Sequence, residues 1–224
     1  MPTLFRNAAL AFALAAMAGN AAAEGAFAQL YAARPPAGSS FVRIVNPAAT
    51  PLRVQIADGP AQEAGAAKPA TTYAIVKGNQ AFTVQVDGKP AASLQVAPDT
   101  FSTLIPRRVD GKLTFAVVDD SNGAQDALKA ELRFYNLAAD CPAGQLGVSP
   151  SGPVLFQDVK PGAAAARAIN PVSATLAAGC GAAASPTMSL PALQPGDHYS
   201  LFLTGSAAAP ILRGQVSTTD PYRR

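Results

Sequence analysis

The sequence predicts an all-β protein with two tandem small antiparallel β-sandwich domains of Ig-like character. Three observations support this fold class. Apolar and polar residues alternate with period two in short runs, turn motifs rich in Gly, Pro and Asp separate those runs, and one pattern of strands recurs 90 to 98 residues further along the chain. Short strands at regular spacing with such turns are typical of sandwiches and barrels.

The alternating runs place apolar side chains on one face of each predicted strand. Successive side chains of a strand point to opposite faces, so each run is expected to bury one face and expose the other. The clearest runs lie at residues 52–56, 82–86, 94–96 and 113–117. The 20 Pro and 18 Gly residues agree with this interpretation, because both residue types favour turns over helix interiors.

The internal repeat suggests two copies of one β-unit. Residues 41–46 resemble residues 131–136, since apolar residues flank an Arg in both and each segment stops at an Asn. Residues 99–102 similarly resemble residues 197–200, where a turn containing Pro precedes an apolar strand. The order is the same in both halves of the chain, so the sequence predicts a duplicated domain.

The first residues have the features of a secretory signal peptide. Arg6 is the only charge before Glu24, residues 8–18 form a short apolar run, and residues 21–23 supply an A-x-A cleavage signature. The apolar run is shorter than the roughly 20 residues that span a bilayer. We therefore expect cleavage after residue 23 and export to the periplasm.

The remaining chain divides at a polar turn. The strand pattern of the first half ends near Asp119, and the sequence 119–123 is polar. We predict an N-terminal sandwich at 24–119, a linker at 120–129 and a C-terminal sandwich at 130–224. The Ala-rich stretch that begins at 124 is interpreted as the connection that leads into the next strand.

Cys141 and Cys180 are the two cysteines of the chain. An exported protein folds in an oxidising compartment, where an even number of cysteines indicates disulfide bonds. Their wide separation is unlike the close CxxC spacing of a redox pair. The sequence therefore predicts a structural disulfide in the second half, whose Ala and Gly stretches bury little apolar area per residue.

The chemistry-bearing residues predict neither a catalytic site nor a cofactor or metal site. His198 is the single histidine, and its neighbour Asp197 should point to the opposite face of the strand. One His and two distant Cys do not make a usual structural zinc site, and no phosphate-binding glycine loop is present. The charge without residues 1–23 is near +2, which is too small to predict a nucleic-acid partner.

Four polar residues of the repeat are candidate partner contacts. Arg43 and Asn46 occupy the same positions in the first copy as Arg133 and Asn136 in the second. They are expected to be exposed, either as contacts for a partner or as ordinary surface and strand-end residues.

Three blocks of the sequence resemble the AlgF family. The first comprises the Leu-Tyr pair at 30–31 and the Gly-Ser-Ser-Phe-Val-Arg segment at 38–43. The second is Ile-Asn-Pro-Val at 169–172, and the third is the late strand 199–205, which ends in Leu-Thr-Gly. They occur in the family's order and span most of the chain. Cys141 and Cys180 depart from the family pattern.

The resemblance implies a function that the residues alone do not. AlgF-like proteins are periplasmic and act in O-acetylation of the exopolysaccharide alginate. The expected role is a non-catalytic adaptor whose partners are periplasmic or membrane-anchored SGNH-type acetyltransferases and a membrane-bound acyl-transfer protein. Two alternatives remain open: a carbohydrate-binding module that contacts the alginate polymer directly, and a chaperone or cell-surface assembly module.

Overall fold

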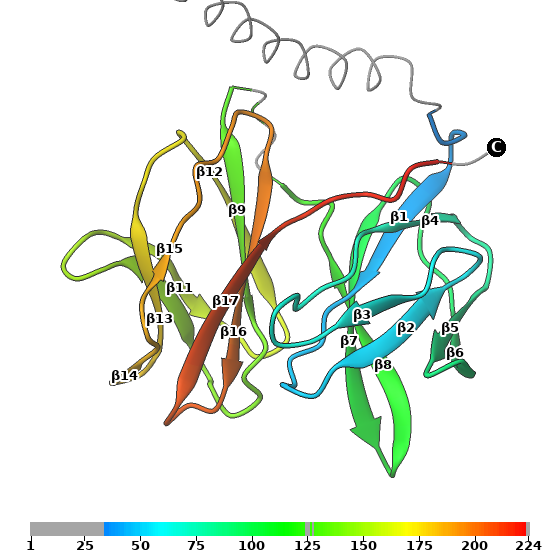
Figure 1. Cartoon of the computed structure of the whole chain (residues 1–224), viewed down its shortest axis with the longest axis horizontal. Coiled ribbons are helices and arrows are strands. Elements are labelled where there is room, and N and C mark those ends of the chain that lie inside the picture. Colours follow the sequence, from blue (N-terminus) through cyan, green and yellow to red (C-terminus); the bar gives the residue numbers. More distant parts are fainter. Residues whose placement is uncertain (1–33, 124–125, 127, 223–224) are drawn as a thin grey trace, which may run out of the picture. The chain divides into compact units, whose positions relative to one another are not determined.

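The strands of the computed structural model form four sheets and confirm the all-β fold class (Figure 1). The structure describes residues 34–123, 126 and 128–222, and no helix occurs in these ranges. The predicted signal peptide at 1–23 lies outside the described residues, as do 124, 125 and 127 of the predicted linker. Within the described ranges there is consequently no helix long and apolar enough to cross a membrane.

The first half of the chain forms two four-stranded sheets with a core between them. Val42, Val54, Val84 and Leu104 are almost completely buried in this core. One sheet has the order β4-β1-β7-β8 and comprises Ala74–Lys77, Ser39–Ile44, Phe101–Val109 and Lys112–Asp119. The other has the order β3-β2-β5-β6 and comprises Gln62–Ala64, Leu52–Ile56, Phe82–Val86 and Lys89–Leu94.

The second half repeats this layout around a separate core. Leu132, Phe134, Leu146 and Leu201 are fully buried there. One sheet has the order β12-β9-β16-β17 and comprises Ala164–Ile169, Ala130–Asn136, His198–Gly205 and Pro210–Val216. The other joins β11, β10, β13, β14 and β15, which are Val154–Val159, Gly144–Val148, Thr175–Cys180, Ala183–Ala184 and Met188–Ser189.

The sequence repeat corresponds to a repeat of strand pairing. β1 pairs in parallel with β7, and Arg43 lies opposite Thr103. In the second half β9 pairs in parallel with β16, and Arg133 lies opposite Ser200. Each parallel pair is flanked by an antiparallel strand on both sides. The segments that resemble each other in sequence therefore occupy the same places in the two halves.

The strands of the parallel pairs are buried on both faces where they pair, which differs from the expected single buried face. All seven residues of β9 are buried. Their alternate faces meet in a third apolar cluster, which contains Val45 and Ile105 from the first half and Tyr135 and Phe202 from the second. This cluster packs the two halves against each other.

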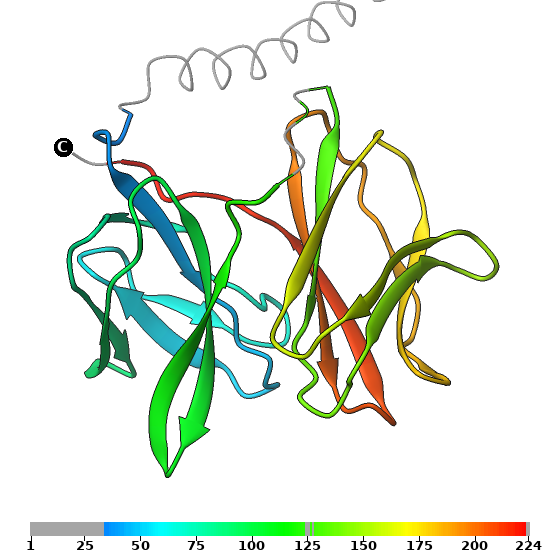
Figure 2. The ribbon, with the colours of Figure 1, turned by 180° about the vertical axis from the view of Figure 1, so that it is seen from behind.

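Residues Pro36–Asp220 consequently form one compact unit (Figure 2). The chain after β17 adds a further connection, because the Tyr73 backbone amide donates to the Thr218 carbonyl at 2.8 Å and Tyr73 pairs with Thr219. The final segment of the second half thus hydrogen-bonds to the first half.

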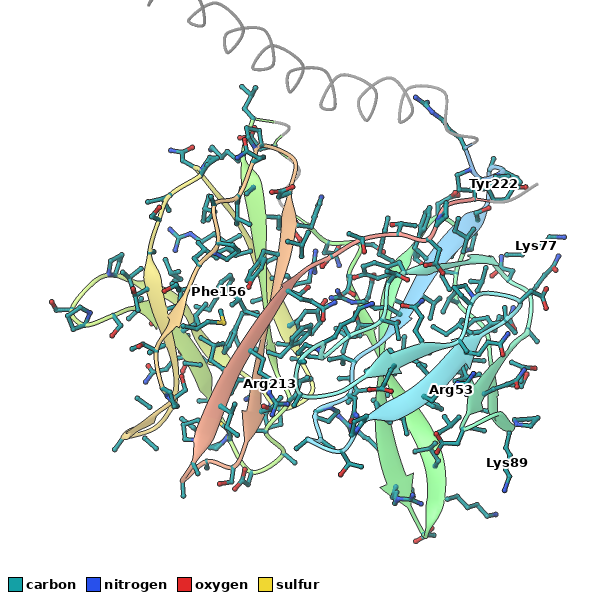
Figure 3. The ribbon with its side chains drawn as sticks, viewed as in Figure 1. Arg53, Lys77, Lys89, Phe156, Arg213 and Tyr222 are labelled. Atoms are coloured by element: carbon teal, nitrogen blue, oxygen red, sulfur yellow. A yellow bond between two sulfur atoms is a disulfide. The ribbon has the colours of Figure 1, made fainter. Side chains whose placement is uncertain are left out.

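Exposed cations occur on both sheets of the first half, and β2 and β4 show the expected alternation. Arg53 lies on β2 between apolar neighbours and is exposed, and so are Lys77 at the end of β4 and Lys89 at the start of β6 (Figure 3). In the second half Phe156 is only 7% exposed and stacks on Phe134, with 5.8 Å between ring centroids.

Candidate functional site

Arg43 is the most deeply buried charged residue of the protein as described, with 0% exposure. It points from β1 into the space between the two halves. Its Nε donates to the Thr103 hydroxyl at 2.8 Å, and its Nη1 donates to Ser217 Oγ at 2.9 Å. Its Nη2 donates to the Tyr135 hydroxyl at 2.7 Å and to Ser200 Oγ at 2.8 Å. One side chain therefore hydrogen-bonds to both halves.

Aromatic rings complete the surroundings of this guanidinium. Arg43 Cζ lies 4.5 Å from the ring centroid of Tyr73, 5.5 Å from that of Tyr135 and 5.7 Å from that of Phe202. A cation over an aromatic face is attracted by the ring quadrupole, more strongly where water is excluded. The rings thus offset part of the cost of burying a charge.

Asp120 is the anion of the same network and is only 6% exposed. Its Oδ2 accepts from the Tyr73 hydroxyl at 2.8 Å, and its Oδ1 accepts from the Tyr135 hydroxyl at 2.7 Å. The Thr103 hydroxyl also donates to Asp120. Tyr135 and Thr103 each accept from Arg43, so two hydroxyls connect the buried cation with the buried anion. The predicted linker thus begins with a buried residue, although its sequence is polar.

Burial and charge shift the pKa values of this network in opposite directions. Burial raises the pKa of Tyr135 to about 12, even though the nearby Arg43 charge lowers it. Burial also raises the pKa of Tyr73. Burial lowers the pKa of Arg43, but the surrounding Tyr135, Tyr73 and Asp120 outweigh it and the net shift is upward. Arg43 therefore remains charged and both phenols remain neutral at ordinary pH.

A second cluster of polar side chains, Glu131, Arg133 and His198, lies next to the Arg43 network on β9 and β16. His198 Nδ1 lies 3.5 Å from Glu131 Oε1, and Arg133 Nη2 donates to the same oxygen at 3.0 Å. Burial alone would raise the pKa of Glu131. The hydrogen bond with His198 and the charges of Arg133 and His198 outweigh burial, so the pKa of Glu131 lies below its ordinary value. Asp197 is turned elsewhere, because its carboxylate accepts from the Gln194 amide at 2.7 Å.

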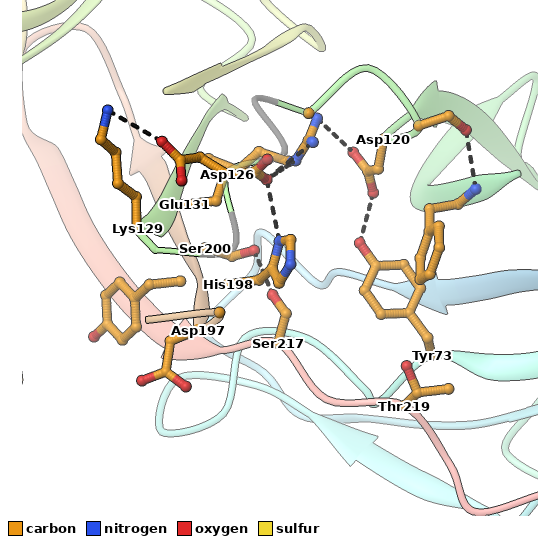
Figure 4. Close-up of a pocket in the computed structure, with 16 residues that line it drawn as sticks. Tyr73, Asp120, Asp126, Lys129, Glu131, Asp197, His198, Ser200, Ser217 and Thr219 are labelled. Carbon is orange, nitrogen blue, oxygen red and sulfur yellow. Dashed lines mark hydrogen bonds and ion pairs between the residues drawn. The ribbon is translucent and has the colours of Figure 1, made fainter. Parts of the chain in front are cut away.

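Members of both groups, among them Asp120, Glu131 and His198, line a cavity of about 530 Å³ (Figure 4). Carboxylates outnumber cations among its lining side chains, and two aromatic residues, Tyr73 and Phe101, contribute from the first half. Its charged lining residues are Asp120, Asp126, Lys129, Glu131, Arg133, Asp197 and His198. The four carboxylates face two permanent cations and one histidine, so the cavity does not favour a polyanion.

Of the three serines that line the cavity, Ser200 and Ser217 hydrogen-bond to the buried arginine, and Ser121 Oγ accepts from the Phe101 backbone amide. Ser200 and Ser217 accept from Arg43, and their hydroxyl oxygens lie 2.9 Å apart. An arginine donates hydrogen bonds but accepts no proton, so it cannot act as the base of a nucleophilic serine. Among the described residues, no three His, Cys, Asp or Glu side chains are grouped to hold a metal ion.

The four residues predicted as exposed are all buried, which corrects that expectation. Arg43 and Asn136 are 0% exposed, Asn46 is 4% exposed, and Arg133 is 8% exposed. Arg43 and Arg133 lie on the strand face that packs against the other half of the protein, whereas Asn46 and Asn136 are buried by hydrogen bonds to loops of their own half. Of the four residues, only Arg133 lines the cavity.

Asn46 and Asn136 share one structural role. The Asn46 amide nitrogen donates to the carbonyls of Thr50 and Ala64, and its oxygen accepts from the Ala48 amide. The Asn136 amide nitrogen likewise donates to the carbonyls of Cys141 and Val159, and its oxygen accepts from the Ala138 amide. Asn136 is the last residue of β9 and Asn46 lies two residues after the end of β1, and each fixes the loop that follows.

The predicted disulfide is present in the structure. Cys141 and Cys180 are bonded, and both are buried in the core of the second half. Cys180 lies at the end of β13, opposite Gly144 of β10. The bond therefore ties the loop after β9 to the outer sheet of the second half.

Sequence reasoning missed Tyr73, Asp120 and Glu131 as members of the site. One available signal was the continuous apolar run Leu201–Leu203, because a strand with apolar residues on both faces is typically covered on both sides. That signal indicates a buried face for the Arg on the adjacent strand. The pairing of Glu131 with His198 depends on parallel register, which the sequence does not specify.

Comparison with known proteins identifies the family of this chain. No protein of curated function matches it. The family model described as alginate O-acetyl transferase AlgF matches residues 9–199, which is most of the chain. The protein therefore belongs to the AlgF family, whose function lies in alginate O-acetylation.

Proposed function

We propose that this protein is a non-catalytic periplasmic adaptor that links acetyltransferase components during alginate O-acetylation. Its partners in this proposal are SGNH-type acetyltransferases and a membrane-bound acyl-transfer protein. The family assignment supports the pathway, and the features of a signal peptide in residues 1–23 support export.

The observation that carries the non-catalytic part is the bonding of Ser200 and Ser217, two of the three serines of the cavity; the third, Ser121, accepts from a backbone amide. Acyl transfer through serine needs a base that removes the hydroxyl proton. Ser200 and Ser217 instead accept hydrogen bonds from Arg43, and His198 Nδ1 pairs with Glu131. These contacts support a structural role for the polar groups of the cavity.

The electrostatics of the cavity favour a protein partner over the polysaccharide. Alginate is a polymer of uronic acids, so each sugar whose carboxyl group is deprotonated carries a negative charge. The carboxylates of the cavity, with Glu131 and Asp120 among them, would repel such a chain. The carbohydrate-binding alternative therefore finds no support at this site.

Complex formation tests the adaptor role. The purified full-length protein without its signal peptide is mixed with a purified SGNH-type acetyltransferase component, and the mass of the eluting species is measured by light scattering. We expect a stoichiometric complex. Elution of the two proteins as separate species, both with that component and with the membrane-bound acyl-transfer protein, would contradict the proposal.

A further inference from the structure

A two-stranded ribbon extends from the inner sheet of the first half. β1 pairs with β7 only from Phe101 to Leu104, whereas β7 and β8 remain paired to the end of their hairpin at Val109 and Lys112. In Figures 1 and 2 this hairpin reaches beyond the neighbouring strands. Residues 107–114, here termed the β7–β8 ribbon, are exposed except for the half-buried Leu113.

The turn gives the ribbon a defined shape. Asp110 has φ 49° and Gly111 has φ 76°, and two consecutive positive φ values are typical of a type I′ hairpin turn. This turn matches the right-handed twist of the flanking strands. The ribbon therefore presents its side chains in fixed alternation on two faces.

The two faces differ in composition. Arg107, Val109 and Lys112 share the face that continues from Ile105, because Val109 lies opposite Lys112 and strand side chains alternate. Arg108 lies opposite Leu113 on the other face. Val109 is 54% exposed, so the first face has an exposed apolar residue between two cations.

This exposed arrangement lowers the stability of the ribbon, and no contact within the ribbon compensates for the loss. A two-stranded ribbon without a covered face is marginally stable. The Arg107 guanidinium lies against Gly162 in the second half, which anchors the base of the ribbon. No comparable contact accounts for Val109 and Lys112 among the described residues.

We propose that the face formed by Arg107, Val109 and Lys112 docks onto an acidic protein surface with an apolar recess. Val109 enters the recess, and the two cations pair with carboxylates at its rim. This inference rests on the proposed adaptor function, because it names the surface through which the protein holds an acetyltransferase component.

The composition of the ribbon favours a protein over an acidic polysaccharide. The ribbon has an exposed valine and no aromatic residue, whereas sugar rings are usually held on aromatic platforms. Apolar burial at the centre of a contact with charged residues around it is the usual anatomy of a protein interface.

Charge-reversal variants of the two ribbon faces test the proposal. Lys112→Glu and Arg108→Glu change the net charge equally and lie on opposite faces of one hairpin. Affinity for the purified SGNH-type acetyltransferase component is measured for both, for Val109→Ser and for the unchanged protein. We expect Lys112→Glu and Val109→Ser to weaken binding about tenfold each, and Arg108→Glu to weaken it less than about threefold. Thermal unfolding of each variant verifies the fold.

Each other result has a defined meaning. Equal weakening by Lys112→Glu and Arg108→Glu, or no weakening by Lys112→Glu and Val109→Ser, overturns the docking face while the adaptor function stands. Binding of polymannuronate by the unchanged protein that Lys112→Glu abolishes assigns the ribbon to the polymer and overturns the inference. Absence of binding between the unchanged protein and the acetyltransferase overturns the adaptor function as well.

Discussion

The two halves place different chemistry at the same position of the repeated strand pair. In the first half Phe41 lies opposite Phe101, and their rings stack with centroids 4.4 Å apart. In the second half Glu131 lies opposite His198, and His198 Nδ1 is 3.5 Å from Glu131 Oε1. The same backbone pairing thus supports an apolar stack in one copy and a polar pair in the other.

The arginines two residues further along the strands differ for the same reason. Arg133 can turn back to Glu131 on its own strand, whereas Arg43 has Phe41 at that place. Arg43 therefore reaches across to Tyr135, Ser200 and other hydroxyls. The comparison teaches that a difference at one position, Phe41 in the first half and Glu131 in the second, directs Arg43 towards the other half. Asn46 and Asn136 keep the same role in both halves.

The largest expected effect separates the two arginines. Arg43→Met leaves the hydroxyls of Thr103, Tyr135, Ser200 and Ser217 without their donor and removes the buried charge that Thr103 and Tyr135 connect with Asp120, which should cost about 3–5 kcal/mol of unfolding free energy. Arg133→Met removes two hydrogen bonds to Glu131 and the 3.8 Å ion pair with Asp120, while Glu131 keeps its contact with His198, and should cost about 1–3 kcal/mol. Denaturant unfolding measures both. Equal losses would show that Arg43 has no special part in joining the halves.

Removal of the disulfide should cause the next largest loss of stability, and the loss should be confined to the second half. Its removal by Cys141→Ser and Cys180→Ser should lower stability by about 3–4 kcal/mol on the chain-entropy model. Amide exchange should accelerate in β10 and β13 before it does in β2 and β5. Acceleration of equal size in all four strands would contradict two separate cores.

The two strand-end asparagines should respond alike. Asn46→Ala and Asn136→Ala each leave two carbonyls and one amide without their side-chain partner, at a cost of about 1–3 kcal/mol or more. Chemical denaturation of the two single variants gives the comparison. A large loss at one site with none at the other would separate their roles.

Acid should produce the smallest of these effects. The folded pKa of Glu131 lies below its ordinary value of 4.5, so the folded protein binds fewer protons there than the unfolded chain. This contribution is present above about pH 4.5 and is lost as the pH falls through the folded pKa. Glu131→Gln should therefore reduce the loss of stability between neutral pH and pH 3. An unchanged acid profile would contradict the contact with His198.

The sequence was informative where local patterns decide the structure. Alternation predicted β2 at Leu52–Ile56 and β5 at Phe82–Val86, and the repeat placed Asn136 at the end of β9 and Asn46 two residues past the end of β1. It failed for Arg43, whose partner Ser217 is 174 residues away in the chain. Period-two alternation indicates that one face of a strand is buried. It gives no information about what covers the other face of the strand once the two halves of the chain pack together.

The cavity was beyond prediction for a related reason. It collects Phe101 from one half, Asp120 from the connection and His198 from the other half. Their proximity follows from how the two inner sheets meet, which depends on tertiary packing and on no local motif. His198 was identified as the single histidine, but its partner Glu131 required the register of β9 with β16.

An acetyl-transfer assay on the purified protein alone tests the central claim of a non-catalytic adaptor most directly. The protein is incubated with an activated acetyl ester, and acetate release and acetyl transfer to polymannuronate are measured for the unchanged chain and for His198→Ala. The account predicts no activity above the uncatalysed rate for either protein. Activity of the unchanged chain that His198→Ala abolishes would contradict it.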